Sequence, residues 1–353
     1  MFNSDRLKTA RERRMLSSKE LAERVGVSVV TFSKYENGHE PDKFMASRLA
    51  MELGYPIDFF YRDQLERLDT STISFRSLAR MKAKERRAAE AAGALGIELY
   101  EWIDTRFNLP QADLIDLSKE RRRPGIAARL LRQHWNLGDR PIGNVLKLIE
   151  SKGIRVLSLS EATKNVDAYS FWRGNHPYIF LNQQKTAERS IFDTAHELGH
   201  LVLHHHAGAK TDKEAETQAD KFASAFLMPE NDLMDYAHIL TAGQIITAKK
   251  RWKTSAMALA YRLHGLGYLT EWQYRSLCIE LGKRGYRSGE PDGIERETST
   301  VLAKVLSALW SKRLTKADIA DDLGIPLEEL EALIFRLSQE RPKPASSGLK
   351  VVR

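Results

Sequence analysis

The chain has 353 residues, enough for two or three domains with cores of their own, and its 55 lysines and arginines against 47 aspartates and glutamates give a net charge of +8. No apolar run reaches the roughly 18 residues of a membrane helix, the first residues lack the apolar core of a secretory signal, and the single cysteine, Cys278, excludes an internal disulfide. These features predict a cytoplasmic protein without membrane contact, and the positive charge favours an anionic partner.

Residues 1–63 carry the start and stop signals of five short helices. The second helix ends at Gly26, and Ser28 caps the third helix, residues 29–36. Two helices joined by so tight a turn are typical of a helix-turn-helix, so this segment is predicted to be a DNA-binding domain.

The signature residues of this segment are Leu21-Ala22, Gly26-Val27-Ser28, and Tyr35-Glu36-Asn37-Gly38 followed by Pro41. On these residues the segment resembles the XRE (Cro/repressor-like) family of DNA-binding domains. The resemblance implies that residues 29–36 enter the major groove of a double-stranded DNA operator, bound by a homodimer. The residues that it assigns to DNA contacts are Ser28, Val29, Val30, Ser33 and Lys34.

The charge of this segment leaves a second interpretation open. Residues 1–63 hold 11 lysines and arginines against 10 aspartates and glutamates, a small excess for a protein that binds phosphates. A helix-turn-helix used only for dimerisation or protein contacts would fit this balance. Ser18 stands where the family often has a glutamine that contacts DNA, so the individual contacts stay open.

Residues 64–125 are predicted to be a helical linker, with one long helix over residues 84–107 that is rich in alanine, glutamate and leucine. The basic run at residues 76–87 leads into that helix. We interpret the run as a solvated helix face, and the alternatives are a further phosphate contact or a brace between protomers.

Residues 126–240 are predicted to form an α+β domain. Its expected elements are helices over residues 127–135 and 142–151, followed by short strands over residues 154–159, 168–172 and 178–181. A turn at residues 174–177, which includes His176, joins the last two strands into a hairpin. An edge strand of such a small sheet can hold an extended peptide through main-chain hydrogen bonds.

The motif His196-Glu197-x-x-His200 follows the predicted sheet, on a stretch that reads as a buried helix. Positions four apart face the same side of a helix, so His196 and His200 can bind one Zn²⁺ together. Glu197 lies beside them and is suited to take the proton of an attacking water. Asp193, one turn before His196, is a candidate to support a ligand by hydrogen bonding.

A catalytic zinc site requires a third protein ligand, and residues 213–227 are predicted to supply it from a second helix. At about 100° per residue, Glu216 points into the apolar face of that helix and Glu214 points away from it. A carboxylate among core residues is costly unless it is paired or binds a metal, so Glu216 is the expected ligand. Asp220, one turn on, is the second candidate for a supporting hydrogen bond to a ligand histidine.

The residues from Ala195 to His204, followed by Glu216-x-x-Ala219-Asp220-x-Phe222-Ala223-x-x-Phe226-Leu227-Met228-Pro229, resemble the ImmA/IrrE family of metallopeptidases. The resemblance implies that His196, His200 and Glu216 bind zinc and that Glu197 is the general base. It also implies a repressor-type protein substrate that is cut in a regulated way, in stress response, mobile-element control or toxin–antitoxin regulation.

Two features near the motif stay open. His204, His205 and His206 follow the helix, and we expect them to cap its C-terminus, because a fourth ligand would close the metal site. Tyr169 or Tyr178 is a candidate to stabilise the oxyanion, and the sequence favours neither of them.

Residues 241–340 are predicted to be a helical C-terminal region, and residues 341–353 a disordered tail. Residues 298–337 are predicted to form a final helical module, in which residues 314–325 resemble a further helix-turn-helix, but Glu328, Glu329 and Glu331 on the following helix would repel phosphate. We interpret this module as an element for dimerisation or for another interaction.

The predicted fold is therefore mainly α: an N-terminal helix-turn-helix bundle, an α+β zincin-like domain with a small sheet, and a helical C-terminal region. The predicted function is a DNA-binding transcriptional regulator with a zinc-dependent endopeptidase domain. The alternative is a non-proteolytic repressor or antitoxin, in which the peptidase fold binds a partner such as a cognate toxin or senses a metal.

Overall fold

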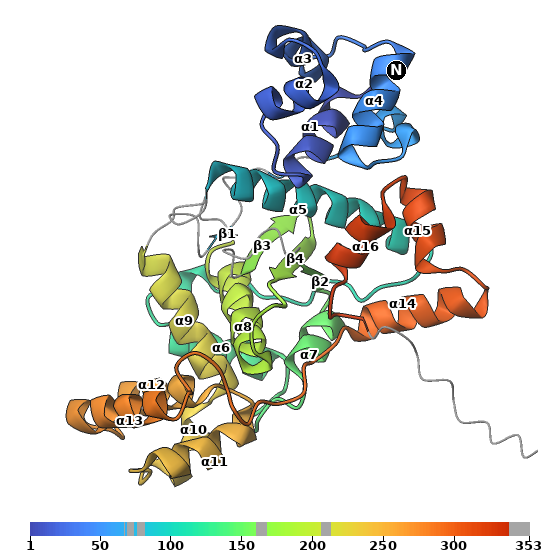
Figure 1. Cartoon of the computed structure of the whole chain (residues 1–353). Coiled ribbons are helices and arrows are strands. Elements are labelled where there is room, and N and C mark those ends of the chain that lie inside the picture. The colour runs from blue at the N-terminus through green and yellow to red at the C-terminus, as the bar shows by residue number, and fades with distance from the viewer. Residues whose placement is uncertain (67, 69–73, 76–81, 160–167, 206–212, 339–353) are drawn as a thin grey trace, which may run out of the picture.

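The structure is a computed structural model that describes residues 1–66, 68, 74–75, 82–159, 168–205 and 213–338. The fold class predicted from the sequence is confirmed: the chain is mainly helical, begins with a helix-turn-helix bundle and contains one small sheet. Figure 1 shows the bundle at one end of the molecule, above the helices that surround the sheet. Among the described residues, no helix is both long and apolar enough to cross a membrane.

The N-terminal bundle consists of α1 (Ser4–Arg13), α2 (Ser18–Val25), α3 (Val29–Glu36), α4 (Lys43–Leu53) and the 3-10 helix η1 (Ile57–Tyr61). Local signals set these boundaries. Ser17 and Glu20 form a reciprocal capping box at the start of α2, and Gly26 ends it in the left-handed conformation at φ 71°. Leu21 and Phe32 are fully buried, so α2 and α3 share one core.

Helix α5 (Ala83–Asp104) runs between the bundle and the sheet (Figure 1). Its small residues allow a close approach to the strands. A Cβ at Gly96 would lie 2.4 Å from Cδ1 of Leu157 and 2.6 Å from Cζ of Phe180, so any larger residue there would have to displace both side chains.

The sheet has the strand order β1-β3-β4-β2, with β1 (Ser74–Phe75), β3 (Ala168–Arg173), β4 (His176–Leu181) and β2 (Arg155–Ser158). The predicted hairpin is β3 and β4, which pair antiparallel, and β2 pairs with β4 in parallel. His176 is the first residue of β4 and pairs with Arg173, rather than lying in the turn. Strand β1 falls within the residues predicted as linker, so the sheet reaches further back in the chain than expected.

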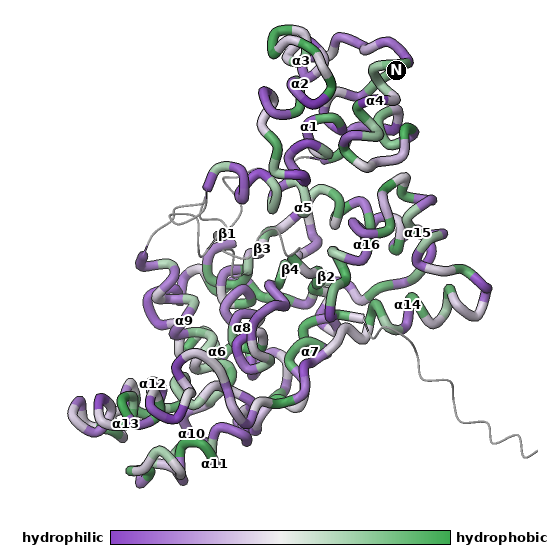
Figure 2. The backbone as a smooth tube through the Cα atoms, viewed as in Figure 1, coloured by the Kyte–Doolittle hydropathy of each residue, from purple (hydrophilic) through white to green (hydrophobic). Residues whose placement is uncertain are grey.

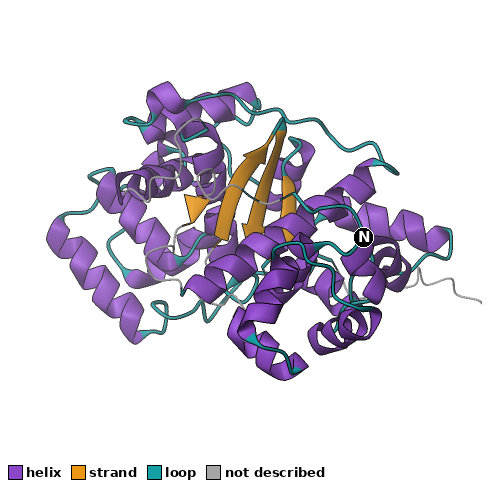
Figure 3. Cartoon of the chain, turned by 90° about the horizontal axis from the view of Figure 1, so that it is seen from above, coloured by secondary structure: helices purple, strands orange, loops and turns teal. Residues whose placement is uncertain are grey.

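Helices enclose the sheet (Figure 3), and the strands are among the hydrophobic segments of the backbone in Figure 2. Helix α8 (Ala187–Leu203) packs on β3 and β4, and α9 (Lys213–Leu227) packs against α8. Helix α6 (Pro124–His134) packs against α9, and α7 (Val145–Ser151) against α8.

A short 3-10 helix, η2 (Ser118–Glu120), precedes α6. The helices after α9 are α10 (Glu230–Leu233), η4 (Met234–Tyr236), α11 (Ala242–Trp252), α12 (Ala256–Gly265), α13 (Glu271–Lys283), α14 (Thr300–Ser311), α15 (Lys316–Leu323) and α16 (Leu327–Leu333). They form two groups rather than one region (Figure 1). Helices α10–α13 lie beyond α6 and α9, whereas α15 and α16 lie beside one end of α5 and α14 packs against α7. Between the groups, the buried ammonium of Lys249 lies 3.4 Å from Glu188 and 2.8 Å from Glu290, which ties the connecting segment to the start of α8.

The module α14–α16, predicted to mediate an interaction, contacts the N-terminal bundle of the same chain. The buried Glu329 of α16 accepts hydrogen bonds from Arg13 and Arg14 of the bundle. Arg62 donates to the carbonyl oxygen of Asp322 at 2.7 Å. Of the three acidic residues expected to repel DNA, Glu329 therefore has basic partners within the protein, whereas Glu328 and Glu331 are exposed. The predicted disordered tail lies outside the described residues.

Candidate metal centre

Helix α8 carries the His-Glu-x-x-His motif through the interior of the protein. Thr186 caps its first turn by accepting a hydrogen bond from the backbone N–H of Arg189. His196 and Glu197 are fully buried and His200 nearly so. The Nε2 atoms of the two histidines face each other at 3.1 Å, as expected for residues one helical turn apart.

Glu216 of α9 meets these two nitrogens. Its Oε2 lies 3.3 Å from Nε2 of His196, and its Oε1 lies 3.2 Å from Nε2 of His200. One ligand atom from each of the three residues falls within 4.8 Å of the others. Glu214 instead accepts a hydrogen bond from Gln218, so the structure brings Glu216 and not Glu214 to the histidines.

The close packing of α8 and α9 depends on Gly199, inside the motif. A Cβ at this position would lie 3.0 Å from Cδ1 of Phe222 and 3.4 Å from the Cα of Ala219. A larger residue would push α9 outward and carry Glu216 away from the histidines.

The electrostatics of the three residues suit a cation. Burial lowers the pKa of His200 to about 4, which keeps its imidazole neutral and able to bind a metal. Burial alone would raise the pKa of Glu216, but the neighbouring imidazoles outweigh it and hold that pKa well below its usual range. Oε2 of Glu216 is buried and has no hydrogen-bond partner among the described residues. Two imidazole nitrogens and a carboxylate with an unsatisfied oxygen are a donor set that fits Zn²⁺ with one position left for water.

Contacts at the Nδ1 atoms, on the side of each ring away from the site, orient both histidines. Oδ1 of Asp220, a residue expected to support a ligand histidine, lies 2.8 Å from Nδ1 of His196. A proton on Nδ1 leaves the Nε2 lone pair directed at Glu216 and His200.

His200 is oriented by a longer chain of contacts that the sequence did not predict. Its Nδ1 lies 3.0 Å from Nδ1 of His204, whose Nε2 lies 2.9 Å from Oε1 of Gln218. The amide of Gln218 then donates to Glu214 at 3.0 Å. With Nε2 of His200 facing the site, its Nδ1–H donates to His204, and each following group donates to the next.

The three histidines after the motif thus differ in their surroundings. His204 occupies the C-cap position of α8, but its side chain contacts His200 and Gln218. His205 packs edge-on against Trp172, with ring centroids 4.6 Å apart. His206 lies outside the described residues.

Glu197 lies beside the three residues and is held by the sheet. Its Oε2 accepts a hydrogen bond of 2.7 Å from the hydroxyl of Ser170 on β3, whereas its buried Oε1 has no hydrogen-bond partner in the part of the chain that the structure describes. Burial raises the pKa of Glu197 to about 8; Glu216 and Asp193 act in the same direction, against His196 and Ser170. Asp193 itself is paired with Arg189 at 3.0 Å and Lys185 at 3.6 Å.

Neither tyrosine considered for the oxyanion faces this site. Alternate residues of a strand point to opposite faces, and Ser170 directs its side chain toward α8. Tyr169 points the other way and donates to the carbonyl oxygen of Ala89 on α5. Tyr178 accepts a hydrogen bond from Arg155 and packs edge-on against Tyr100 of α5. The expectation that one of these two stabilises the oxyanion is therefore not supported.

The residues expected to contact DNA lie together on α3 and its cap. Val30 is 70% exposed, Val29 is 45% exposed, and Ser33 and Lys34 are also exposed. The hydroxyl of Ser28 accepts from the backbone N–H of Thr31, so this residue holds the first turn of the helix. Helix α3 lies at the outer end of the bundle (Figure 1).

The basic run predicted at residues 76–87 is described only from residue 82 onward. Within that part, Lys84 pairs with Glu20 of the bundle at 2.6 Å, and Arg86 lies 3.6 Å from Glu90 on its own helix. Lys84 thus links α5 to the bundle, and residues 76–81 lie outside the described residues.

Comparison with protein families identifies two domain types in the chain. A family model described as helix-turn-helix matches residues 7–60. A family model described as IrrE N-terminal-like domain, of a peptidase family, matches residues 149–264, which include β2, β3, β4, α8 and α9. No curated protein matches the chain. The pairing of the two domain types predicted from the sequence is confirmed.

Proposed function

Because the chain joins an XRE-type helix-turn-helix domain to an IrrE N-terminal-like domain, we propose that it is a cytoplasmic transcriptional regulator whose second domain is a zinc endopeptidase. We propose that its substrate is a repressor-type protein. The observation that carries this proposal is the convergence of His196, His200 and Glu216 beside the buried carboxylate of Glu197.

The roles that we propose follow from the contacts. His196, His200 and Glu216 hold the metal, and a Zn²⁺ ion there would polarise a water molecule and the carbonyl group of the peptide. Glu197 takes the proton of the attacking water on its unpartnered Oε1, while Ser170 holds its other oxygen. It then returns the proton to the amine of the leaving peptide. The pKa of about 8 describes Glu197 without a cation beside it, and a bound cation would shift that pKa downward, toward the ionised base.

For the first domain we propose that α3 reads a double-stranded operator. Its exposed residues, Val29, Val30, Ser33 and Lys34, offer apolar contacts, a hydroxyl group and a positive charge within two turns of helix. A homodimer would read two half-sites about one helical turn of DNA apart.

The test of the metal centre compares the zinc content of matched variants after purification without chelator. We expect about one Zn²⁺ per chain in the wild type and loss of most of it in His196→Ala and Glu216→Ala. Glu214→Ala also removes a glutamate side chain from this helix, two residues earlier, and should retain the metal. Retention of zinc by Glu216→Ala together with its loss from Glu214→Ala would contradict the ligand assignment.

The test of the reaction incubates the zinc-loaded protein with candidate repressors, beginning with any encoded by neighbouring genes. Cleavage at one position by the wild type, and none by Glu197→Gln, is the expected result. If a zinc-loaded wild type cuts none of them while it binds a toxin or another partner through the same domain, the non-proteolytic alternative replaces the peptidase.

A further inference from the structure

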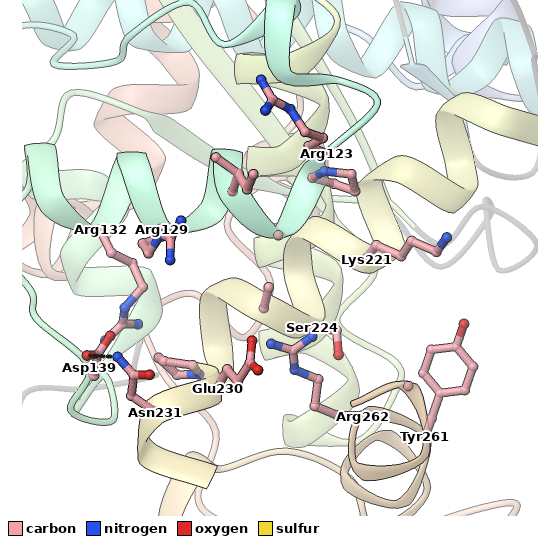
Figure 4. Close-up of a pocket in the computed structure, with 16 residues that line it drawn as sticks. Arg123, Arg129, Arg132, Asp139, Lys221, Ser224, Glu230, Asn231, Tyr261 and Arg262 are labelled. Carbon is pink, nitrogen blue, oxygen red and sulfur yellow. Dashed lines mark hydrogen bonds between the residues drawn. The ribbon is translucent and has the colours of Figure 1, made fainter. Parts of the chain in front are cut away.

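A cleft of about 480 Å³ lies between α6, α9, α10 and α12, and it shares no lining residue with the candidate metal centre (Figure 4). Its volume is within the range of sites that bind small molecules. Helix α9 contributes to both places, because it supplies Glu216 to the metal centre and Lys221 and Ser224 to the cleft.

The cleft is strongly basic. Five of its lining residues are cationic and two are acidic: Arg123, Arg129, Arg132, Lys221 and Arg262 against Asp139 and Glu230. Figure 4 shows Arg262 between Arg129 and Lys221, with the ammonium of Lys221 directed away from the other two side chains. Arg129 and Lys221 are exposed, and neither has an ion-pair partner among the residues that the structure describes.

Two of the arginines, the buried Arg132 and the half-buried Arg262, donate hydrogen bonds to neutral partners. Arg132 donates to the carbonyl oxygens of Gly138, Phe226 and Arg140, and Arg262 donates to that of Met228. Burial lowers the pKa of Arg132 to about 10 and also lowers that of Arg262, because nearby acids only partly offset the loss of water. A buried positive charge without a matching anion is unfavourable, so an anion in the cleft would stabilise both side chains.

The wall of the cleft also offers uncharged donors. Helix α6 begins there at Pro124 without a side-chain cap; Pro124 has no N–H and those of Ile126 and Ala127 donate to the carbonyl oxygen of Arg123, so the first turn presents the backbone N–H of Gly125 and the positive end of the helix dipole. A Cβ at Gly125 would meet no atom within 4 Å, which leaves this turn open to an approaching ligand. The hydroxyl of Ser224, in a residue only 4% exposed, has no hydrogen-bond partner within the described residues. An unsatisfied buried hydroxyl beside an uncapped helix start is independent support for a polar ligand.

We propose that this basic cleft binds a phosphorylated small molecule of about nucleotide size. Its phosphate would bind Arg129 and Arg262 near the first turn of α6, and Lys221 would add positive charge at the rim of the cleft. Its less polar part would pack on Tyr261, which is 49% exposed at the edge of the cleft. The protein thereby gains a ligand-binding function that is independent of the proposed peptidase reaction.

Calorimetric titration of the full chain tests this proposal with three probes: adenosine monophosphate, inorganic pyrophosphate and adenosine. We expect saturable binding of the two phosphorylated probes, tightest for adenosine monophosphate, and at least about tenfold weaker binding of adenosine, because a charge-assisted hydrogen bond contributes that much or more. Absence of saturable binding of both phosphorylated probes up to about 10 mM would overturn the proposal.

Substitutions of lining residues test whether the ligand binds in this cleft. Lys221→Glu, and Arg129→Ala combined with Lys221→Ala, should weaken adenosine monophosphate at least about tenfold. These side chains are exposed, so the fold should survive, and a matched thermal melt checks this. The control combines Lys147→Ala with Lys304→Ala, two exposed lysines outside the cleft, and should bind like the wild type. Equal losses in the control and the cleft variants would mean general electrostatic attraction and would overturn the site.

Discussion

Replacement of Glu329 by glutamine tests whether the N-terminal bundle is fastened to the C-terminal module. The side chain of Glu329 is 3% exposed, and its carboxylate accepts two hydrogen bonds from Arg13, at 2.6 and 2.9 Å, and one from Arg14, at 2.6 Å. Burial alone would raise the pKa of Glu329, but the two arginines outweigh it and hold that pKa below its usual range. This pair joins positions 316 residues apart in the chain.

The expected cost of the substitution follows from what Arg13 loses. Its side chain is also 3% exposed, and without Glu329 it keeps a 3.3 Å hydrogen bond to the carbonyl oxygen of Ala88. Removing one partner of a buried ion pair costs about 3–5 kcal/mol, and glutamine retains one acceptor, so we expect about 3 kcal/mol. At about 1.4 kcal/mol per factor of ten, the equilibrium between docked and separated bundle should shift about 100-fold.

Amide hydrogen exchange at neutral pH measures this shift directly. Peptides from α1 and α16 should exchange up to about 100-fold faster in Glu329→Gln than in the wild type. Glu328→Gln is the matched control, because Glu328 is the preceding residue of the same helix and is exposed. Unchanged protection of α1 and α16 in Glu329→Gln would refute the argument that this ion pair holds the bundle in place.

Three further predictions concern pH, zinc affinity and DNA. The pKa of Glu329 is depressed in the folded protein, so the stability that its carboxylate contributes is fully present above the ordinary value of 4.5 and is lost as the pH falls through the folded value. Urea titrations measure the difference in unfolding free energy between the wild type and Glu329→Gln, and this difference should shrink below pH 4.5. His204→Ala should weaken zinc binding about 10- to 100-fold in competition with a chromophoric chelator, because it removes the acceptor that orients His200, whereas His205→Ala should leave the affinity unchanged. Ser33→Ala combined with Lys34→Ala should weaken operator binding in a gel-shift assay by about 1–3 kcal/mol or more, and unchanged binding would move DNA recognition away from α3.

The parts of the fold that the sequence predicts are those with local causes. The capping box of Ser17 and Glu20, the left-handed Gly26 and the cap at Thr186 depend on residues within one helical turn. Local spacing also predicts the candidate ligands, because His196 and His200 are one turn apart and Glu216 lies on the apolar side of its own helix.

The features that the sequence did not reveal depend on contacts between distant segments. Ser170 reaches Glu197 only because of the way β3 packs on α8, and alternation along that strand turns Tyr169 toward α5 instead. The sequence shows that Gln218 lies one helical turn after Glu214. Its contact with His204 depends on the packing of two different helices. In the sequence, Glu329 is one of several acidic residues on its helix. Its pairing with Arg13 depends on the folded arrangement of both ends of the chain.

The proposed role of Glu197 as the base of a regulatory peptidase is tested most directly in cells that carry Glu197→Gln. The substitution keeps the size of the side chain and its place beside Ser170, so zinc content and operator binding should match the wild type. We predict that transcription of the regulon no longer responds to its inducing condition and that immunoblots show the candidate repressor intact. Wild-type transcription and wild-type loss of the repressor in this strain, under conditions where the native regulon responds, would contradict the proposed mechanism.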